Sequence, residues 1–322
     1  MRRTPTRCSC RIWGWTRSWS PNSGSVALSR DHRLHRSYLY APGSNPDVMR
    51  KALRAGADAV ILDLEDAVAP SAKEGARAAV ADLLDEIAGQ DTACDVHVRV
   101  NAGPDGVDVD DLAAVVRPAL RAVRIPKVES AAAIRELAAT LDDLEARAGL
   151  PVGDVGIYPT IESAAAVVAL AEICGASARI VRCALGSSDL LADLAASGDD
   201  DTATLYARSA LVVHSRAAGI GPPVDSVHTD LQDEPGLKRS AQRGRSLGFH
   251  GKSVIHPRQL PAVHEVFTPG GGEVAAAREI VAAADAADRA GVGATRIGAA
   301  FVDPAIVARA RALLGLVDTE QD

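Results

Sequence analysis

Aromatic side chains are scarce in this sequence: phenylalanine, tryptophan and tyrosine together make up 3% of its 322 residues. Its five cysteines form no CxxC pair and are too few for a disulfide framework, which favours a reducing compartment, so we expect a cytoplasmic protein. The chain lacks the roughly 18 consecutive apolar residues of a membrane-spanning helix, and no membrane partner is expected. With 47% hydrophobic and 24% charged residues it can bury a large core, which excludes wholesale disorder.

Charge is unevenly distributed along the chain. Residues 1–36 hold eight arginines and a single acid, Asp31, so this segment carries +7 and the remaining residues carry −14 of the net −7. An acidic body argues against binding to nucleic acid, whose phosphates must be neutralised by basic side chains. The segment over 1–35 has neither helical nor strand periodicity. We expect it to be a disordered basic tail, either a transit segment or the result of a translation start placed too far upstream.

Short apolar runs of strand type alternate with alanine-rich helical segments from Tyr38 onward. Eight strands are predicted, at 37–41, 59–65, 95–101, 122–127, 155–162, 179–186, 223–227 and 252–256. Strands that alternate with helices form a parallel sheet, and eight repeats predict closure into a (β/α)₈ TIM barrel. A doubly wound sheet is the alternative, but no GxGxxG turn follows the first strand. We expect the barrel over 36–265 and a C-terminal helical extension over 266–322.

Polar residues gather at the carboxyl ends of the predicted strands, where active sites of this fold lie. Within DVHVRV, alternation with period 2 places His97 and Arg99 on the face opposite three valines, so Arg99 points inward at the mouth of the barrel. An inward arginine needs an anionic partner, because an unpaired buried charge costs several kcal/mol. The run LDLED, with Asp63, Glu65 and Asp66, could supply that partner.

Glu162 and Asp189 are the pair that the sequence favours as metal ligands. Both are acids at strand ends, and Asp189 lies in a GSSD turn where a compact loop can direct its carboxylate. Two carboxylates with waters and substrate oxygens are typical of a magnesium site, whereas the cysteine and histidine groupings of structural zinc are lacking. The alternative is that Glu162 caps the helix that follows it, because first-turn amides favour an acid.

Two further residues have both structural and functional interpretations. Lys127 lies where a Schiff-base lysine could, but it is flanked by Glu129, and a paired lysine keeps its proton. We therefore expect Lys127 to be structural. His256 is followed by Pro257, which ends the strand, and we expect a core histidine there.

The segments that carry these residues resemble the citrate lyase β-subunit family of coenzyme A ester lyases, which includes malyl-CoA and citramalyl-CoA lyases. Matching segments include RSYLYAPGSNPDVMRKALRAGADAVILDLEDAV, VRVN, IPKVES, PTIESAAAV, ALGSSDLLADL, GKSVIHPRQL and FVDPAIVARARALL, in family order over 36–314. The resemblance implies a (β/α)₈ barrel, bound Mg²⁺, and reversible Claisen-type cleavage or condensation of a CoA thioester. It also implies a homotrimer or homohexamer.

The resemblance implies roles for five residues, namely Arg99, Asp66, Asp303, Glu162 and Asp189. Arg99 would be the catalytic arginine and would face the substrate, with Asp66 as its supporting acid. Glu162 and Asp189 would bind the metal, and Glu162 would also contact the substrate. Asp303 would reach the site of a neighbouring subunit.

Two departures from the family pattern accompany these assignments. Ser188 stands where many members have an acid directly before the metal-binding aspartate, and Pro304 follows Asp303 directly where relatives often insert a residue. Related activities stay open: a CoA-independent aldolase acting on hydroxy-keto acids, and a thioesterase acting on malyl-CoA. A non-catalytic partner subunit is a further class, but the joint presence of Arg99, Glu162 and Asp189 argues against it.

Overall fold

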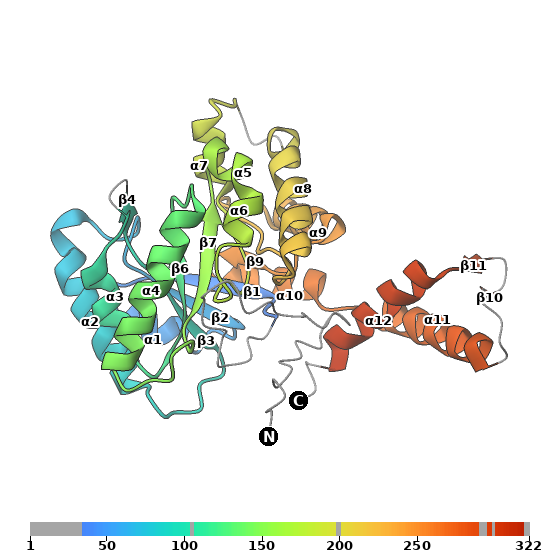
Figure 1. Ribbon diagram of the computed structural model, residues 1–322, viewed down its shortest axis with the longest axis horizontal. Coiled ribbons are helices and arrows are strands. Elements are labelled where there is room, and N and C mark those ends of the chain that lie inside the picture. The colour runs from blue at the N-terminus through green and yellow to red at the C-terminus, as the bar shows by residue number, and fades with distance from the viewer. Residues whose placement is uncertain (1–33, 104–105, 198–200, 290–294, 298–299, 319–322) are drawn as a thin grey trace, which may run out of the picture. The chain divides into compact units, whose positions relative to one another are not determined.

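The computed structural model describes residues 34–103, 106–197, 201–289, 295–297 and 300–318 (Figure 1). The chain divides into two compact units, one ending at Phe267 and the other beginning at Thr268. Residues 1–33 of the expected basic tail lie outside the described residues. In the part of the chain that the structure describes, no helix is long and apolar enough to cross a lipid bilayer.

A seven-stranded sheet in the order β8-β7-β6-β3-β2-β1-β9 forms the centre of the first unit. All of its pairings are parallel, which gives the α/β architecture that the strand–helix alternation predicts. The strands are β1 (Ser37–Pro42), β2 (Ala59–Asp63), β3 (Asp95–Arg99), β6 (Leu120–Ile125), β7 (Gly156–Ile161), β8 (Ala184–Leu185) and β9 (Lys252–Val254).

The strand predicted at 223–227 is not a member of this sheet. Val224 and Asp225 form only single bridges, to Ala184 and Lys252 respectively. The two residues before Val224 are prolines, which have no backbone N–H to donate, so the segment cannot extend a continuous ladder. The strand predicted over 179–186 is likewise reduced to the two residues of β8.

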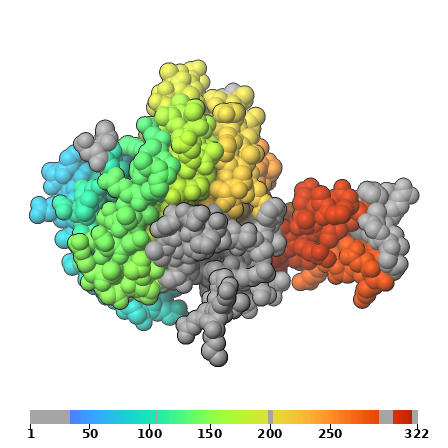
Figure 2. Space-filling model, viewed as in Figure 1, coloured from blue at the N-terminus to red at the C-terminus, as the bar shows by residue number. Residues whose placement is uncertain are grey.

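Helices follow the strands along the chain, and Figure 1 shows α2, α3 and α4 together along one side of the sheet. Asn45, Ser130 and Ser163 begin α1, α4 and α5 by accepting a first-turn N–H. Residues of α4 (green) and α8 (yellow) lie at the surface in Figure 2. The helices are α1 (Pro46–Ala52), η3 (Pro70–Ala72), α2 (Lys73–Glu86), α3 (Val109–Val115), α4 (Ala131–Arg147), α5 (Ala164–Val168), α6 (Leu170–Cys174), α7 (Ser187–Asp193), α8 (Asp201–Ala218), α9 (Glu234–Leu247), η4 (Pro257–Gln259) and α10 (Leu260–Phe267).

The two faces of the sheet bury different side chains. Val96 and Val98 of β3 belong to the large aliphatic cluster that includes helix residues such as Ile134 of α4. His97 lies on the opposite face, where its ring centroid is 4.7 Å from that of Tyr158. The alternation predicted for this strand is therefore present, and it directs Arg99 to the same face as His97.

Asp225, an acid within the strand predicted at 223–227, is a buried structural residue. Its carboxylate pairs with the Lys252 ammonium at 2.7 Å and with Arg208. Burial alone would raise the pKa of Asp225, but the two cations lower it below its usual value. These pairs hold the bridged segment against β9 and α8.

His250 makes the stability of the fold depend on pH. Its side chain is buried, with its ring centroid 6.0 Å from that of Phe267. Burial, reinforced by the charge of Arg182, lowers the pKa of His250 to about 3. An unfolded histidine titrates near pH 6.5, so below that pH the unfolded chain takes up a proton that the folded chain does not. The contribution of neutral His250 to the free energy of unfolding is fully present above pH 6.5 and decreases as the pH falls toward 3.

We therefore expect His250 to cost the wild-type protein about 2 kcal/mol of unfolding free energy between pH 8 and pH 5. The His250→Gln variant should lack this part of the pH dependence. Urea unfolding of both proteins at the two pH values measures it. Equal losses in the two proteins would show that His250 does not carry the effect.

The second unit pairs two helices. They are α11 (Gly271–Arg289) and α12 (Pro304–Asp318), and between them lie β10 (Thr295–Ile297) and β11 (Ala300–Val302), which pair antiparallel. The Arg311 guanidinium lies 2.6 Å from the Asp285 carboxylate and joins α12 to α11.

Candidate active site

The predicted site residues of the first unit lie at the carboxyl ends of strands. Asp63 ends β2 and Arg99 ends β3, and the two are paired in register. Glu162 directly follows β7, and Asp189 lies in the first turn of α7, shortly after β8. Because the carboxyl ends of parallel strands share one edge of a sheet, these four side chains lie at the same edge.

Arg99 is held by acids from the neighbouring strand. Its Nε and Nη2 donate to the two oxygens of Asp63 at 2.7 and 2.6 Å, and its Nη1 lies 2.8 Å from Oε2 of Glu65. The guanidinium carbon lies 5.1 Å from the ring centroid of Tyr40. Burial alone would lower the pKa of Arg99, but hydrogen bonding to Asp63 and the nearby negative charges raise it above its ordinary value. Arg99 is therefore a permanent, oriented cation.

Asp66 is the loosest of the three acids around Arg99. Its Oδ2 lies 3.4 Å from Nη1 of Arg99 and its side chain is 65% exposed, whereas the side chain of Asp63 is 2% exposed. The acidic run does supply the partner of Arg99, but the two-oxygen contact comes from Asp63. Position in the sequence did not separate the two acids, because the strand was predicted to run to residue 65, whereas β2 ends at Asp63.

Glu162 is a buried carboxylate in an acidic environment. Its Oε1 accepts the backbone N–H of Lys127 at 2.6 Å. Burial, together with the negative charges of Asp189 and Glu65, raises the pKa of Glu162 to about 7, against the opposing effects of that N–H and of Arg99. The capping alternative is wrong, because α5 is capped by Ser163.

Glu162 and Asp189 fit a magnesium ion. Asp189 is exposed at the start of α7, close enough for its charge to raise the pKa of Glu162, and a cation would relieve their repulsion. Within the described residues no cluster of three or more His, Cys, Asp or Glu side chains could hold a metal. A site with two protein carboxylates, completed by oxygens of water or substrate, suits Mg²⁺.

Gly186 keeps these two acids together. A Cβ at this position would lie 2.5 Å from Oε2 and 2.7 Å from Cβ of Glu162, so only glycine lets the chain pass this close before α7 begins. We expect Gly186→Ala to displace the Glu162 carboxylate and lower both turnover and Mg²⁺ affinity by about 10- to 100-fold.

Gly175→Ala is the matched control, because the Cβ added there would meet its nearest atom at 3.5 Å, an ordinary contact. Turnover assays and calorimetric titration with Mg²⁺ on both variants check the expectation. Wild-type Mg²⁺ affinity in folded Gly186→Ala would contradict it.

Lys127 is paired, but not with the residue that the sequence suggests. Its Nζ lies 2.7 Å from Oε1 of Glu65, and Glu129 instead accepts the hydroxyl of Ser163 at 2.7 Å. Hydrogen bonding to Glu65 raises the pKa of Lys127, so the amine stays protonated. A protonated amine is a poor nucleophile, which disfavours the Schiff-base interpretation.

Arg124 is an interior residue that the sequence reasoning missed. It is fully buried on β6, paired in register with Arg99, and none of its three guanidinium nitrogens has a hydrogen-bond partner among the described residues. Its charge lies over the rings of Tyr38 and Tyr158, at 4.4 and 5.2 Å from their centroids. The available signal was strand alternation, which places Arg124 on the same face as Ala122.

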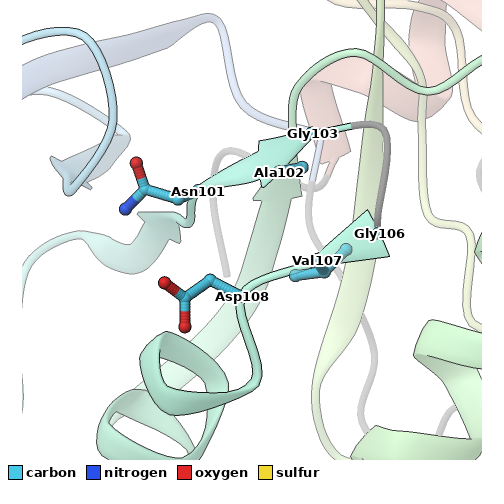
Figure 3. A pocket seen from close by; sticks show the side chains of 6 residues that line it. All are labelled: Asn101, Ala102, Gly103, Gly106, Val107 and Asp108. Atoms are coloured by element: carbon cyan, nitrogen blue, oxygen red, sulfur yellow. The ribbon is translucent and has the colours of Figure 1, made fainter.

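A pocket of about 300 Å³ lies beside the site, between β4 (Ala102–Gly103) and β5 (Gly106–Val107). Asn101 and Asp108 extend to the same side of this hairpin (Figure 3). Oδ1 of Asn101 accepts from Nζ of Lys73 at 2.5 Å, and the same amine donates to the backbone oxygen of Glu65 at 3.0 Å. The hydrogen bonds of Lys73 therefore connect the lining of the pocket to the acidic segment that contacts Arg99.

The remaining predicted residues have local roles in the structure. His256 is half-buried and is not the core histidine that we expected: it begins η4, where its Nδ1 accepts the N–H of Arg258 at 3.1 Å. Asp303 belongs to the second unit and caps α12, its Oδ1 accepting the N–H of Ile306 at 2.8 Å.

Comparison with known proteins identifies the class to which this fold and site belong. The family model for HpcH/HpaI aldolase/citrate lyase matches residues 36–257. The chain therefore belongs to the HpcH/HpaI aldolase/citrate lyase family.

Individual relatives span nearly the whole chain. The citrate lyase subunit beta of Leuconostoc mesenteroides subsp. cremoris is 36% identical, with 89% of this chain and 95% of that protein covered. The L-malyl-CoA/β-methylmalyl-CoA lyase of Rhodobacter capsulatus is 33% identical over 88% of this chain and 94% of that protein. The crystal structure of CitE from Mycobacterium tuberculosis in complex with magnesium, acetoacetate and coenzyme A has 32% identity and a TM-score of 0.69, covering 88% of this chain and 97% of that chain.

Proposed function

We propose that this protein is a Mg²⁺-dependent carbon–carbon lyase that acts on a 3-hydroxyacyl-CoA thioester such as malyl-CoA or citramalyl-CoA. The observation that carries the proposal is the pairing of two close carboxylates, Glu162 and Asp189, with the braced cation Arg99 at one edge of the sheet. Relatives named citrate lyase subunit beta and L-malyl-CoA/β-methylmalyl-CoA lyase, and a neighbour crystallised with magnesium, acetoacetate and coenzyme A, support the same chemistry.

Retro-Claisen cleavage places definite demands on the site. The C2–C3 bond of the acyl chain breaks, its electron pair moves into the thioester as an enolate, and the hydroxyl carbon becomes the carbonyl of a 2-oxo acid. The hydroxyl proton must go to a base, and the enolate carbon must then be protonated to give the shortened acyl-CoA. Glu162 and Asp189 would hold a magnesium ion, which would supply a Lewis acid for oxygens of the substrate.

Arg99 has donors left for the developing enolate. Two of its five N–H bonds donate to Asp63, and Nη1 donates to Asp66 at 3.4 Å and lies 2.8 Å from Oε2 of Glu65, which leaves two N–H bonds for the substrate. Because Asp63 fixes the plane of the guanidinium, these donors are preorganised toward charge that forms in the transition state. Asp66 supports this arrangement from the solvent side.

Product analysis tests the proposal. Purified protein is mixed with malyl-CoA, citramalyl-CoA or a CoA-free hydroxy-keto acid, with Mg²⁺ or with EDTA, and the 2-oxo acid, the shortened acyl-CoA and free CoA are measured. We expect equal amounts of 2-oxo acid and acyl-CoA, formed only with Mg²⁺. Release of free CoA without 2-oxo acid would identify a thioesterase instead, and cleavage restricted to CoA-free hydroxy-keto acids would identify an aldolase. No turnover of any of these substrates would overturn the proposal.

We also propose that the sheet is the wall of a (β/α)₈ barrel over 36–265, with 266–322 as a C-terminal extension. The support is the set of single parallel bridges that join Ala184 to Val224 and Asp225 to Lys252, which connect β8 to β9 through the seventh predicted strand. Since β9 also pairs with β1, these bridges support a ring of eight strand positions, although the segment between β8 and β9 contributes single bridges rather than a continuous strand.

A homotrimer or homohexamer is the assembly that we propose, with Asp303 delivered to the site of a neighbouring subunit as a proton relay. Mixing Asp303→Ala protein with Arg99→Ala protein should then restore part of the activity, because some mixed sites contain both residues. Activity is measured after subunit exchange has been verified by native mass spectrometry. No recovery in exchanged oligomers would contradict the shared site.

A further inference from the structure

Lys127 has a backbone conformation that lysine rarely adopts. Its φ is +55°, and among the described residues the only other non-glycine with positive φ is Ala195. For an L-residue this left-handed region costs roughly 1–2 kcal/mol, whereas glycine adopts it almost freely. The strain is therefore retained at a position where the lysine side chain contributes something that glycine could not.

The strained backbone directs one contact and the side chain another. The N–H of Lys127 donates to Oε1 of Glu162 at 2.6 Å, and Nζ lies 2.7 Å from Oε1 of Glu65. Glu162 follows β7, which is the neighbour of β6 on one side. Glu65 follows β2, which lies beyond β3 on the other side. One residue thus contacts acids from two strands that do not touch each other.

Glu65, the acid that the Lys127 ammonium contacts, also contacts Arg99. Oε2 of Glu65 lies 2.8 Å from Nη1 of Arg99, and Glu65 as a whole is 5% exposed. A buried carboxylate shared between two cations is fixed in position by both of them. Removing the ammonium leaves Glu65 with Arg99 as its cationic partner, and the carboxylate is then free to rotate.

We infer that Lys127 is a positioning residue that sets the geometry of the two halves of the site relative to each other. Its backbone N–H holds the Glu162 carboxylate in the orientation for the metal, and its ammonium holds Glu65 and, through Glu65, the Arg99 guanidinium. This inference rests on the proposed function for the roles of Glu162 and Arg99. The two contacts themselves are separable by mutation.

Two substitutions separate them. Lys127→Gly keeps the N–H and favours the left-handed backbone but removes the ammonium. We expect turnover to fall by about 10- to 100-fold while Mg²⁺ affinity stays within about threefold of wild type. Lys127→Val removes the ammonium and also disfavours positive φ, because its side chain is β-branched. We expect it to lose the same turnover and, in addition, about tenfold in Mg²⁺ affinity. Lys127→Ala replaces the valine variant if that variant does not fold.

Three further variants serve as controls for the two Lys127 substitutions. Glu65→Gln removes the other end of the side-chain contact, so the Lys127→Gly, Glu65→Gln double variant should be no slower than the slower single variant. Ala195→Gly relaxes the other strained residue without touching the site, and it should match wild type in turnover and Mg²⁺ affinity.

Calorimetric titration with Mg²⁺, thermal unfolding without metal, and turnover on the CoA substrates are measured for every variant. Equal Mg²⁺ affinity in the glycine and valine variants would overturn the backbone contact, and wild-type turnover in Lys127→Gly would overturn the side-chain contact. Multiplicative losses in the double variant would show that Lys127 and Glu65 act separately. If wild type turns over none of the substrates, the proposed function fails, while the Mg²⁺ titrations still decide the backbone contact.

Discussion

Glu162→Ala is expected to abolish measurable Mg²⁺ binding and to lower turnover by about 10³-fold, or roughly 4 kcal/mol of barrier. The Glu162 carboxylate is buried, is held by the N–H of Lys127 and lies close to Asp189. It is therefore better oriented than Asp189, the other proposed ligand. Its removal leaves Asp189, an exposed acid, to bind the metal alone. Turnover on the CoA substrates and calorimetric titration with Mg²⁺ measure the two effects.

In the metal-free protein, loss of the Glu162 charge should leave the thermal stability unchanged or raise it. Burial and the like charges of Asp189 and Glu65 disfavour the charged Glu162. Glu162→Gln, which keeps an acceptor for the N–H of Lys127, should therefore unfold at the same temperature as wild type or higher. Glu129→Ala is the control, since Glu129 is an exposed acid of the adjacent loop whose partner is Ser163. Retained Mg²⁺ binding in folded Glu162→Ala would refute the proposed metal site.

Arg99→Lys is expected to lower turnover by about 10²-fold, or roughly 2.7 kcal/mol of barrier, although it keeps the positive charge. Lysine cannot reproduce the fork that contacts both oxygens of Asp63 while leaving donors for the substrate. The enolate then loses a preorganised hydrogen-bond donor. Steady-state kinetics should show the loss mainly in kcat, because the interaction forms as charge develops.

Arg36→Lys provides a matched control for this prediction. Arg36 makes the same kind of two-oxygen contact, from Nε and Nη2 to Asp58 at 3.0 and 2.9 Å, away from the proposed site. We expect Arg36→Lys to keep wild-type turnover and to lose only stability. If Arg99→Lys likewise lost stability and kept its turnover, Arg99 would be a structural arginine.

Strand positions and the site edge were predictable because they depend on local sequence. Period-2 alternation in DVHVRV places His97 and Arg99 on the face opposite the valines, and His97 does contact Tyr158 on that face. The sequence also identified the acids that follow strands, Asp63 and Glu162 among them. The strand predicted at 223–227 is present only as single bridges. Its hydrogen bonding depends on the paths of β8 and β9 rather than on its own residues.

By itself, then, the sequence determined the parallel α/β architecture, the placement of acids and arginine at one edge of the sheet, and the family. Only the tertiary structure decided which partners these residues take. Asp63 rather than Asp66 makes the two-oxygen contact with Arg99, and Glu65 rather than Glu129 pairs with Lys127. Arg124 lies buried over two tyrosine rings. The reason is physical: periodicity along a chain sets which way a side chain points, but a contact between residues far apart in sequence depends on the register and spacing of neighbouring strands.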